Sequence, residues 1–208
     1  MTRRDRSGLQ VRRVLLFCLA LVPLCAAKDW QYEETKTDSR EFVAGGYLHV
    51  RMSVGDLHVR RGDSTQIRLQ YTVKSRHERN VKEARVDFEV RGSDANIEFH
   101  SPTSGNTNFD VELEVPANTN VDLHQKVGDM TIDDITGDKL VNIGVGDLRI
   151  TTEHTGYRLV NASTGIGDVH TTYGQTSGWL GKTLKYHGEG KYELRAHVGV
   201  GDIRVEGD

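Results

Sequence analysis

VDLHQKVGDMTI at residues 121–132 and KLVNIGVGDLRI at residues 139–150 are two copies of one twelve-residue unit, separated by the spacer DDITGD. In each copy, apolar residues alternate with other residues up to a Gly-Asp pair, and two further apolar positions follow that pair. Alternation with a period of two predicts a β-strand with one buried face, and its phase shifts by one residue at the Gly-Asp pair. Since glycine adopts unusual backbone angles and aspartate bonds to nearby backbone groups, we expect the chain to turn a corner there.

The same unit occurs five times, at residues 48–59, 121–132, 139–150, 160–171 and 194–205. Each unit has six positions that we expect to point inward, thirty in all, and twenty-six of these are apolar. The exceptions are Gln125, Lys139, Thr164 and Thr171, and Leu140 is the one apolar residue among the twenty positions expected to point outward. This pattern predicts a β-solenoid, in which β-rungs stack around a shared core. Unrelated hairpins are the alternative, but they would not require the same Gly-Asp pair at the same phase in every unit.

Residues 1–27 have the organisation of a secretory signal peptide. Five arginines precede the apolar run Val14–Leu24, and Cys25-Ala26-Ala27 supplies small residues at a cleavage site. The apolar run is too short to span a bilayer. We therefore expect cleavage after Ala27 and export, and lipidation of Cys25 stays open as an alternative.

Removal of residues 1–27 changes the composition of the chain. Both cysteines, Cys18 and Cys25, lie in that segment, so the exported chain would have no disulfide and no thiol chemistry. Five basic residues and one acidic residue are lost with it, which leaves 22 Lys+Arg against 29 Asp+Glu and a net charge of −7. We expect no nucleic-acid partner, because no basic patch is evident to neutralise phosphates. Nothing after the signal peptide resembles a transmembrane anchor.

The remaining segments predict one all-β domain at residues 42–208, preceded by a flexible, charged lead-in at residues 28–41. Residues 60–120 contain four further alternating segments, which predict an antiparallel strand excursion with polar turns. Residues 172–193 predict a decorated loop or hairpin. No window has a sustained 3.6-residue apolar stripe, so no long helix is expected.

The segments VELEVP at residues 111–116 and NVDL at residues 120–123, followed by the repeated pattern Val-Gly-Asp-aliphatic-x-aliphatic, resemble the DUF4097 family of adhesin-like proteins of the bacterial envelope. The resemblance covers about residues 42–207. It implies a β-helical domain and an adhesin-like role. It implies no catalytic residues.

The corner aspartates are the first candidate site. If the units stack in sequence order, Asp129, Asp147 and Asp168 recur about 4.8 Å apart, the spacing between strands. Carboxylates at that spacing repel each other unless they are solvated, hydrogen-bonded or bridged by a cation, and calcium is the natural hard cation. We favour the competing interpretation, in which each aspartate bonds backbone N–H groups at its corner. No other metal and no cofactor is expected.

Two pairs of outward-facing histidines share a column in the aligned units. His124 and His197 form one pair and His58 and His170 the other, each three rungs apart in sequence order, or roughly 14 Å. That separation is too large for one metal ion, so a solvated face is the better interpretation. His49 also points outward.

Two other features invite a binding hypothesis. Arg61-Gly62-Asp63-Ser64 spells an integrin-recognition tetrapeptide, but Gly-Asp is the commonest corner of this chain, so we do not expect recognition through it. The aromatic residues of the C-terminal region would form either a sugar-binding ledge or, as we prefer, a cap on the open end of the core. They are Tyr173, Trp179, Tyr186 and Tyr192.

A polysaccharide-active β-helix enzyme would gather several carboxylates in one groove, whereas the acidic residues here are expected at corners. The sequence also contains no nucleophile elbow, HExxH motif or phosphate-binding loop. We expect a non-catalytic, adhesin-like binding module of the bacterial cell envelope, located in the periplasm, on the surface or outside the cell. Its partner would be a surface glycan or an envelope protein. An envelope stress sensor or scaffold that binds a protein is the second hypothesis, and an enzyme is the third.

Overall fold

The structure, a computed structural model, describes residues 30–62, 65–102 and 106–207. These residues are almost entirely β-structure, with one six-residue helix, α1 (Glu78–Glu83), and one 3-10 turn at His154–Gly156. The all-β prediction is therefore confirmed. The strands are β1 (Tyr32–Glu41), β2 (Tyr47–Arg61), β3 (Gln66–Ser75), β4 (Arg85–Arg91), β5 (Asp94–His100), β6 (Thr107–Val115), β7 (Asn120–Val127), β8 (Met130–Asp133), β9 (Lys139–Val145), β10 (Leu148–Thr152), β11 (Tyr157–Ile166), β12 (Val169–Thr171), β13 (Thr176–Ser177), β14 (Thr183–His187), β15 (Tyr192–Val200) and β16 (Ile203–Gly207).

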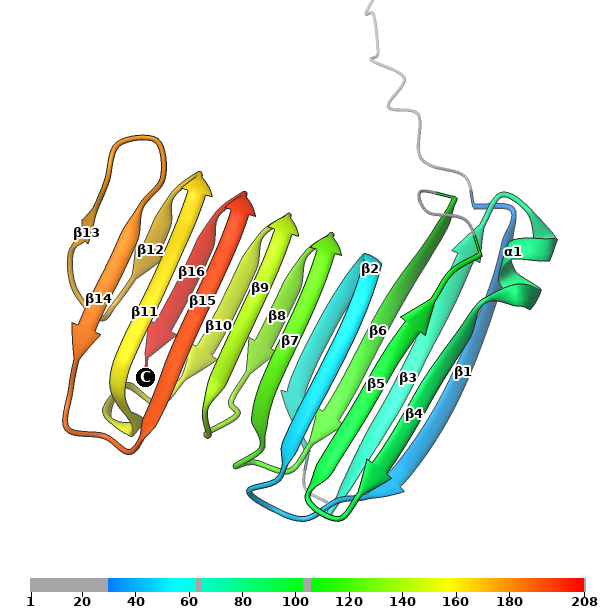
Figure 1. Ribbon diagram of the computed structural model, residues 1–208, viewed down its shortest axis with the longest axis horizontal. Helices are drawn as coiled ribbons and strands as arrows, with labels where there is room; N and C mark the ends of the chain where they lie inside the picture. The colour runs from blue at the N-terminus through cyan, green and yellow to red at the C-terminus, as the bar shows by residue number, and fades with distance from the viewer. Residues whose placement is uncertain (1–29, 63–64, 103–105, 208) are drawn as a thin grey trace, which may run out of the picture.

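Each predicted unit forms a rung, with one segment before the Gly-Asp corner and one after it. The first segments lie parallel in the order β2, β7, β9, β15, β11, and we call this layer the front sheet. The second segments lie parallel in the order β2, β8, β10, β16, β12 and form the back sheet. Figure 1 shows the two layers, with β2 running through its corner from one layer to the other.

The rungs do not stack in sequence order. The C-terminal unit, residues 194–205, lies between the units at 139–150 and 160–171, because β15 pairs with β9 on one side and with β11 on the other. The sequence order that we assumed when we aligned the aspartate and histidine columns therefore does not hold. The physical reason is that all units present the same alternating face, so the pattern carries no information about which unit neighbours which.

Five of the six expected inward positions are buried in four of the units, and four are buried in the unit at residues 160–171, where Thr171 is only partly buried. In the third unit, for example, Val141, Ile143, Leu148 and Ile150 are buried. The position directly before the glycine points to solvent instead, and its exposed fraction is 45–58% in four of the five units. This residue is still the last one of its strand, as Val145 is of β9, but it lies next to the positive-φ glycine of the corner and its side chain faces away from the core. The exposed residues are Val127, Val145, Ile166 and Val200, and Val54 is partly exposed.

The polar residues expected at inward positions bond to the backbone. Gln125 Nε2 donates to the Gly55 carbonyl at 2.6 Å, which joins two neighbouring corners. Thr164 Oγ1 donates to the Gly167 carbonyl at 2.8 Å and accepts from the Lys182 N–H at 2.9 Å. Buried polar atoms need hydrogen-bond partners. These residues therefore fill an inward position and also form a hydrogen bond with the backbone, which an apolar side chain could not form.

The excursion at residues 60–120 contains the four predicted strands, β3 to β6, but two of them pair differently from our expectation. β5 and β6 lie parallel to β2, one in each sheet, and thus add a further rung to the stack. Only β4 and β3 run antiparallel, outside β5 and β6. One predicted polar turn holds helix α1.

Residues 32–41, expected within a flexible lead-in, form the edge strand β1, which pairs antiparallel with β3. Almost all of its side chains are exposed, so the sequence has no apolar alternation to reveal it. Lys36 and Arg40 form ion pairs with Glu34 and Asp38 on the same strand. Charged side chains on an edge strand discourage further pairing with another chain.

Residues 172–193 form the predicted hairpin at the opposite end. β14 pairs antiparallel with β11, and β13 with β14. No helix in the described ranges is long and apolar enough to cross a membrane.

Corner glycines allow neighbouring rungs to approach closely. Gly128, Gly146 and Gly201 have φ values of 125°, 142° and 137°. A Cβ atom added to each would lie 1.8–2.1 Å from the carbonyl oxygen of the corner glycine in the neighbouring rung. Glycine is thus required both for backbone conformation and for space.

We expect Gly146→Ala to destabilise the fold by more than about 3 kcal/mol, because it combines backbone strain with a collision in the stack. Gly174→Ala is the matched control, since Gly174 has a similar φ of 150° but nothing within 4 Å of an added Cβ. Urea denaturation should place Gly146→Ala well below Gly174→Ala in stability. Equal losses for the two variants would contradict the proposed contact between corners.

Candidate binding surfaces

The corner aspartates form a ladder of hydrogen bonds from rung to rung. Asp129 N–H donates to Asp56 Oδ1 at 3.1 Å, and Asp147 N–H donates to Asp129 Oδ1 at 2.9 Å. The ladder continues from Asp202 N–H to Asp147 Oδ1 and from Asp168 N–H to Asp202 Oδ1, both at 2.8 Å. Four of the five carboxylates, all except that of Asp168 at the end of the ladder, therefore accept a backbone N–H, as in the capping interpretation, and the N–H belongs to the neighbouring rung.

The stacking order changes the candidate calcium site. Asp129 and Asp147 are neighbours, but Asp202 lies between Asp147 and Asp168. In the part of the chain that the structure describes, no group of three or more His, Cys, Asp or Glu side chains is placed to hold a metal ion. Calcium binding at Asp129, Asp147 and Asp168 stays a prediction to be tested.

We expect Asp147→Ala to destabilise the fold by about 0.5–1.5 kcal/mol, because the Asp202 N–H loses its acceptor. Asp147→Asn should be at least as stable as the parent, since the amide oxygen still accepts that bond and one carboxylate charge is removed from the column. Thermal melting of the three proteins tests this order.

The same melts test calcium. With capping as the role of the column, chelator and millimolar calcium should leave the melting temperature unchanged. A ligand present at 100 times its Kd would add about 2.7 kcal/mol of stability, which melting readily detects. A calcium-dependent rise that Asp147→Asn abolishes would overturn the capping interpretation.

Charged side chains on the back sheet are largely paired with each other. His58 lies between Glu112 and Asp133, with ring nitrogens 3.2 and 2.8 Å from their carboxylate oxygens. Arg149 and Arg204 both contact Glu206, at 3.1 and 3.5 Å. This face therefore presents few unengaged charges to a partner.

The front sheet carries a row of polar side chains across successive rungs. Arg51, His124, Asn142, His197 and Ser163 are register partners from β2 to β11. His197 Nδ1 lies 3.1 Å from Ser163 Oγ. The parallel register holds these side chains at strand spacing on a rigid surface.

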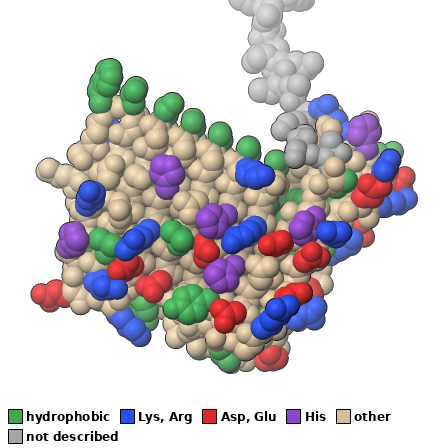
Figure 2. All heavy atoms as spheres, viewed as in Figure 1, with side chains coloured by type: hydrophobic (Ala, Val, Ile, Leu, Met, Phe, Trp, Pro, Cys, Tyr) green, Lys and Arg blue, Asp and Glu red, His purple; other side chains and the backbone are tan. Residues whose placement is uncertain are grey.

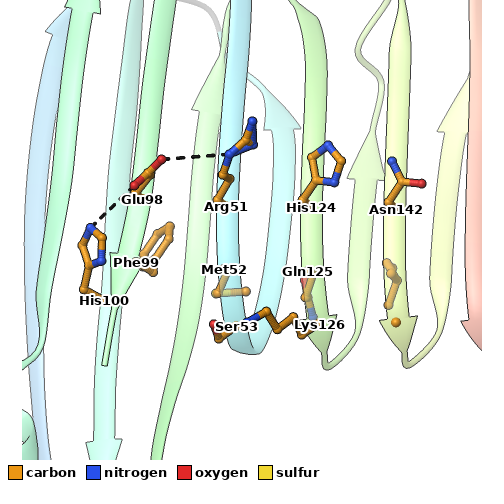
Figure 3. Close-up of a pocket in the computed structure, with 12 residues that line it drawn as sticks. Arg51, Met52, Ser53, Glu98, Phe99, His100, His124, Gln125, Lys126 and Asn142 are labelled. Carbon is orange, nitrogen blue, oxygen red and sulfur yellow. Dashed lines mark ion pairs between the residues drawn. The ribbon is translucent and has the colours of Figure 1, made fainter. Parts of the chain in front are cut away.

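One end of this row borders an open hollow of about 730 Å³. Figure 3 shows Arg51, His124 and Asn142 side by side on neighbouring strands, with Glu98 bridging Arg51 and His100. The Glu98 carboxylate lies 4.0 Å from Arg51 and 3.7 Å from His100. The hollow is lined by Arg51, Met52, Ser53, Glu98, Phe99, His100, His124, Gln125, Lys126, Asn142, Ile143 and Gly144.

The histidine columns follow the observed stacking order. His124 and His197 are two rungs apart, on β7 and β15, and His58 and His170 are four rungs apart. At strand spacing these separations are roughly 10 Å and 19 Å, so our expectation that both pairs are equally far apart is wrong. Both distances are still too large for the two histidines of a pair to bind one metal ion. His49 and His124 both contact Asp122, at 3.1 and 2.8 Å.

The C-terminal aromatic residues divide into two groups. Tyr173 is buried and stacks on His154, and Tyr186 packs edge-on against both rings, which agrees with a capping role. Trp179 projects into solvent with 90% of its surface exposed, so it caps nothing. The tetrapeptide beginning at Arg61 includes Asp63 and Ser64, which lie outside the described residues.

Lys139, which the alternating pattern placed at an inward position, is buried at the edge of the core. Lys139 Nζ donates to the carbonyl oxygens of Ile135 and Gly137 and to the hydroxyl of Tyr157. Tyr157 in turn donates to the Gly137 carbonyl at 3.1 Å. Burial lowers the pKa of Lys139 to about 7, and burial also raises the pKa of Tyr157.

We expect the stability of the protein to rise with pH above about 7, because Lys139 is deprotonated in the fold there but still protonated in the unfolded chain up to its ordinary pKa of 10.5. The slope contributed by this residue is at most about 1.4 kcal/mol per pH unit. Below pH 7 both states bind the proton and the contribution is constant. Urea denaturation at pH 7, 8 and 9 should give Lys139→Met a flatter profile than the parent, whereas parallel profiles would show that Lys139 does not titrate in this window.

Comparisons with known proteins place the fold. No family model matches the chain, and no curated protein matches it either. Among solved structures, a putative cell adhesion protein from Clostridium sporogenes is 15% identical, with a TM-score of 0.50 over 84% of this chain and 100% of that one. A putative lipid binding protein from Parabacteroides distasonis is 11% identical, with a TM-score of 0.32 over 82% and 96% of the two chains. A putative adhesin from Bacteroides fragilis is 9% identical, with a TM-score of 0.27 over 83% and 97%. The first likeness shows the fold, and the other two carry no argument.

Proposed function

We propose that this chain is an exported, non-catalytic binding module of the bacterial cell envelope, built as a short β-solenoid of the DUF4097 family. Its partner would be an extended molecule, either a surface glycan chain or a segment of an envelope protein. The leader at residues 1–27 and the repeated Val-Gly-Asp pattern support export and the family. The likeness to the Clostridium sporogenes protein supports the fold, and the adhesive role enters here as part of the proposal.

The polar row on the front sheet is the observation that carries the proposal. It crosses five rungs from Arg51 to Ser163 and borders the open hollow at its Arg51 end. A row of short polar groups at a fixed spacing suits many weak contacts with an extended chain, whose binding energy grows with the number of contacts. Charges on both sheets are paired, but the row on the front sheet also includes the neutral side chains of Asn142 and Ser163, which are available for hydrogen bonds with a glycan or a peptide.

Catalysis fits the described residues poorly. The two residues with the largest pKa shifts, Lys139 and Tyr157, are buried, and their polar atoms are engaged in hydrogen bonds. At the hollow, Glu98 contacts Arg51 and His100, and no second carboxylate lines that hollow. A glycosidase would need two carboxylates flanking the same bond.

The protein should be purified as the producing cell exports it and tested on a glycan array, in a pull-down from envelope extracts, and against a panel of polysaccharides for turnover. We expect saturable binding without product. The double variant Arg51→Ala/Asn142→Ala should lose at least about tenfold in affinity, because it removes two neighbouring contacts from the row.

Arg149→Ala/Thr131→Ala is the matched control. It also replaces one arginine and one neutral polar residue, but on the back sheet, where an exposed ion pair contributes little stability. Equal losses in the two double variants would contradict binding through the front sheet. A single protein captured from the envelope would favour the sensor or scaffold hypothesis, and release of a polysaccharide product would refute the binding module.

A further inference from the structure

An apolar ridge runs along one edge of the molecule, at the corners where the front-sheet strands end. Register places Val54 beside Val127, Val145, Val200 and then Ile166, one residue from each of five successive rungs. The Leu180 carbonyl accepts the Gly167 N–H, which adds Leu180 and its neighbour Trp179 to the end of the row. Figure 2 shows hydrophobic side chains strung along this upper edge, above a band with few charged side chains.

The exposure of this ridge is unusual because it is continuous. Its exposed fractions rise from 45% at Val127 and Val200 to 67% at Leu180 and 90% at Trp179. Single exposed apolar residues are ordinary on protein surfaces, whereas an aligned row of them indicates an interaction site. The corner geometry does not require valine or isoleucine at these positions, since their side chains pack in no core.

The surroundings of the ridge decide what it contacts. Gly144, Gly199 and Gly165 lie on its front side in three rungs, so no side chain covers the ridge there, and Lys126 occupies the same position in the rung of β7. The ridge has one residue from each rung, whereas a stable interface with a second copy buries a broad patch of roughly 800 Å² per partner. A narrow apolar ridge that ends in an exposed tryptophan fits the headgroup region of a lipid bilayer, where aromatic residues are favoured.

The described chain begins at the same edge. Tyr32, the first residue of β1, pairs with Ser75, and Ser75 pairs with Thr107 of β6. Thr107 lies two residues before Phe109, which pairs with Gly55 at the first corner. Figure 1 shows β1 starting at the edge where β7, β9, β15 and β11 end. Lipidation of Cys25, the alternative to cleavage after Ala27, would attach the chain to a bilayer seven residues before Tyr32. Seven residues span at most about 25 Å, so this attachment would hold the ridge close to the membrane.

We infer that the apolar ridge rests in the headgroup region of a lipid bilayer and orients the domain with its strands upright on the membrane. This inference rests on the export that we propose, but not on the identity of the partner bound by the front sheet. The acidic corners beside the ridge, Asp56 to Asp202, disfavour anionic lipid, so insertion is driven by apolar contact and not by charge.

The test uses the protein as the producing cell exports it, in a Trp30→Phe background that leaves Trp179 as the one tryptophan. It is mixed with phosphatidylcholine vesicles, with and without added phosphatidylglycerol, at low and high salt. We expect the emission of Trp179 to shift to shorter wavelength and to be quenched by lipids brominated near the headgroup, at both salt concentrations. Quenching reports the position of Trp179 itself, so retention of the leader does not mimic it.

The ridge variant Val145→Ser/Val200→Ser/Ile166→Ser should require at least about tenfold more lipid for the same quenching. Asn142→Ser/His197→Ser/Ser163→Ala is the matched control on the same three strands, and it should need the same amount of lipid as the parent for this quenching, whatever its effect on binding by the front sheet. All three proteins should melt alike, since the ridge residues are about half exposed.

Four results would overturn the inference. They are equal quenching in the ridge variant and the parent, no spectral shift with any vesicle, binding only to phosphatidylglycerol and only at low salt, and a lipid-free shift accompanied by a dimeric mass in sedimentation. The last result would assign the ridge to a second copy. Failure of glycan or protein binding by the front sheet would leave this outcome unaffected.

Discussion

The close approach of one corner glycine to the carbonyl oxygen of the corner glycine in the neighbouring rung is the contact on which the rest of the structure depends. An added Cβ would lie about 2 Å from that oxygen at every corner from Gly128 to Gly201. Because nothing intervenes, backbone hydrogen bonds continue through the corner, as from the Gly128 N–H to the Val145 carbonyl at 2.9 Å. The aspartate after each glycine then reaches the next corner and adds a second bond per rung. The two sheets are thereby joined along a full edge without a disulfide in the described chain.

The opposite edge shows how the same physical requirement is met with other residues. Asn120 Oδ1 accepts the Asp138 N–H at 2.9 Å, and Asp138 Oδ1 accepts the Glu193 N–H at 2.8 Å. Asn and Asp are suited to this bridge, because their short side chains place an oxygen three bonds from Cα, within reach of the neighbouring backbone. The C-terminal strands take part in both ladders, through Glu193 and Asp202, and β15 lies between β9 and β11 in the front sheet. Contacts of such sequence separation favour slow folding.

Sequence periodicity was sufficient to predict the rungs, their corners and the buried positions on either side of each corner, because one repeated constraint generates all of them. It misplaced Val145 and its equivalents, since alternation alone cannot locate the residue at which a positive-φ glycine ends the strand. It could not order the rungs, because equivalent units compete for the same neighbours. Strand β1 was not predicted because both of its faces are largely exposed.

The Lys139–Tyr157 contact was not predicted because the two residues lie eighteen positions apart and belong to different strands, β9 and β11. Of the candidate sites, the aspartate column was foreseen, whereas the hollow at Arg51 joins β5 to the first rung through a pairing that the pattern of the excursion does not reveal.

A stack of rungs has two ends, two faces and two edges, and they differ in how much of their surface is free to contact a partner. One end is covered by the antiparallel strands β4, β3 and β1, and the other by β14 and β13, so neither offers a long unpaired strand of the stack for addition by a partner. The back face is occupied by its own ion pairs, and one edge by the Asn120–Asp138–Glu193 ladder. The polar row of the front face and the apolar ridge above it are what remain. The row and the ridge cross the same strands and both run perpendicular to the strand direction. The glycines at 144, 199 and 165 lie between them. A domain that rests on its ridge would therefore hold the polar row parallel to the supporting surface and facing sideways, in reach of an extended molecule that lies along it.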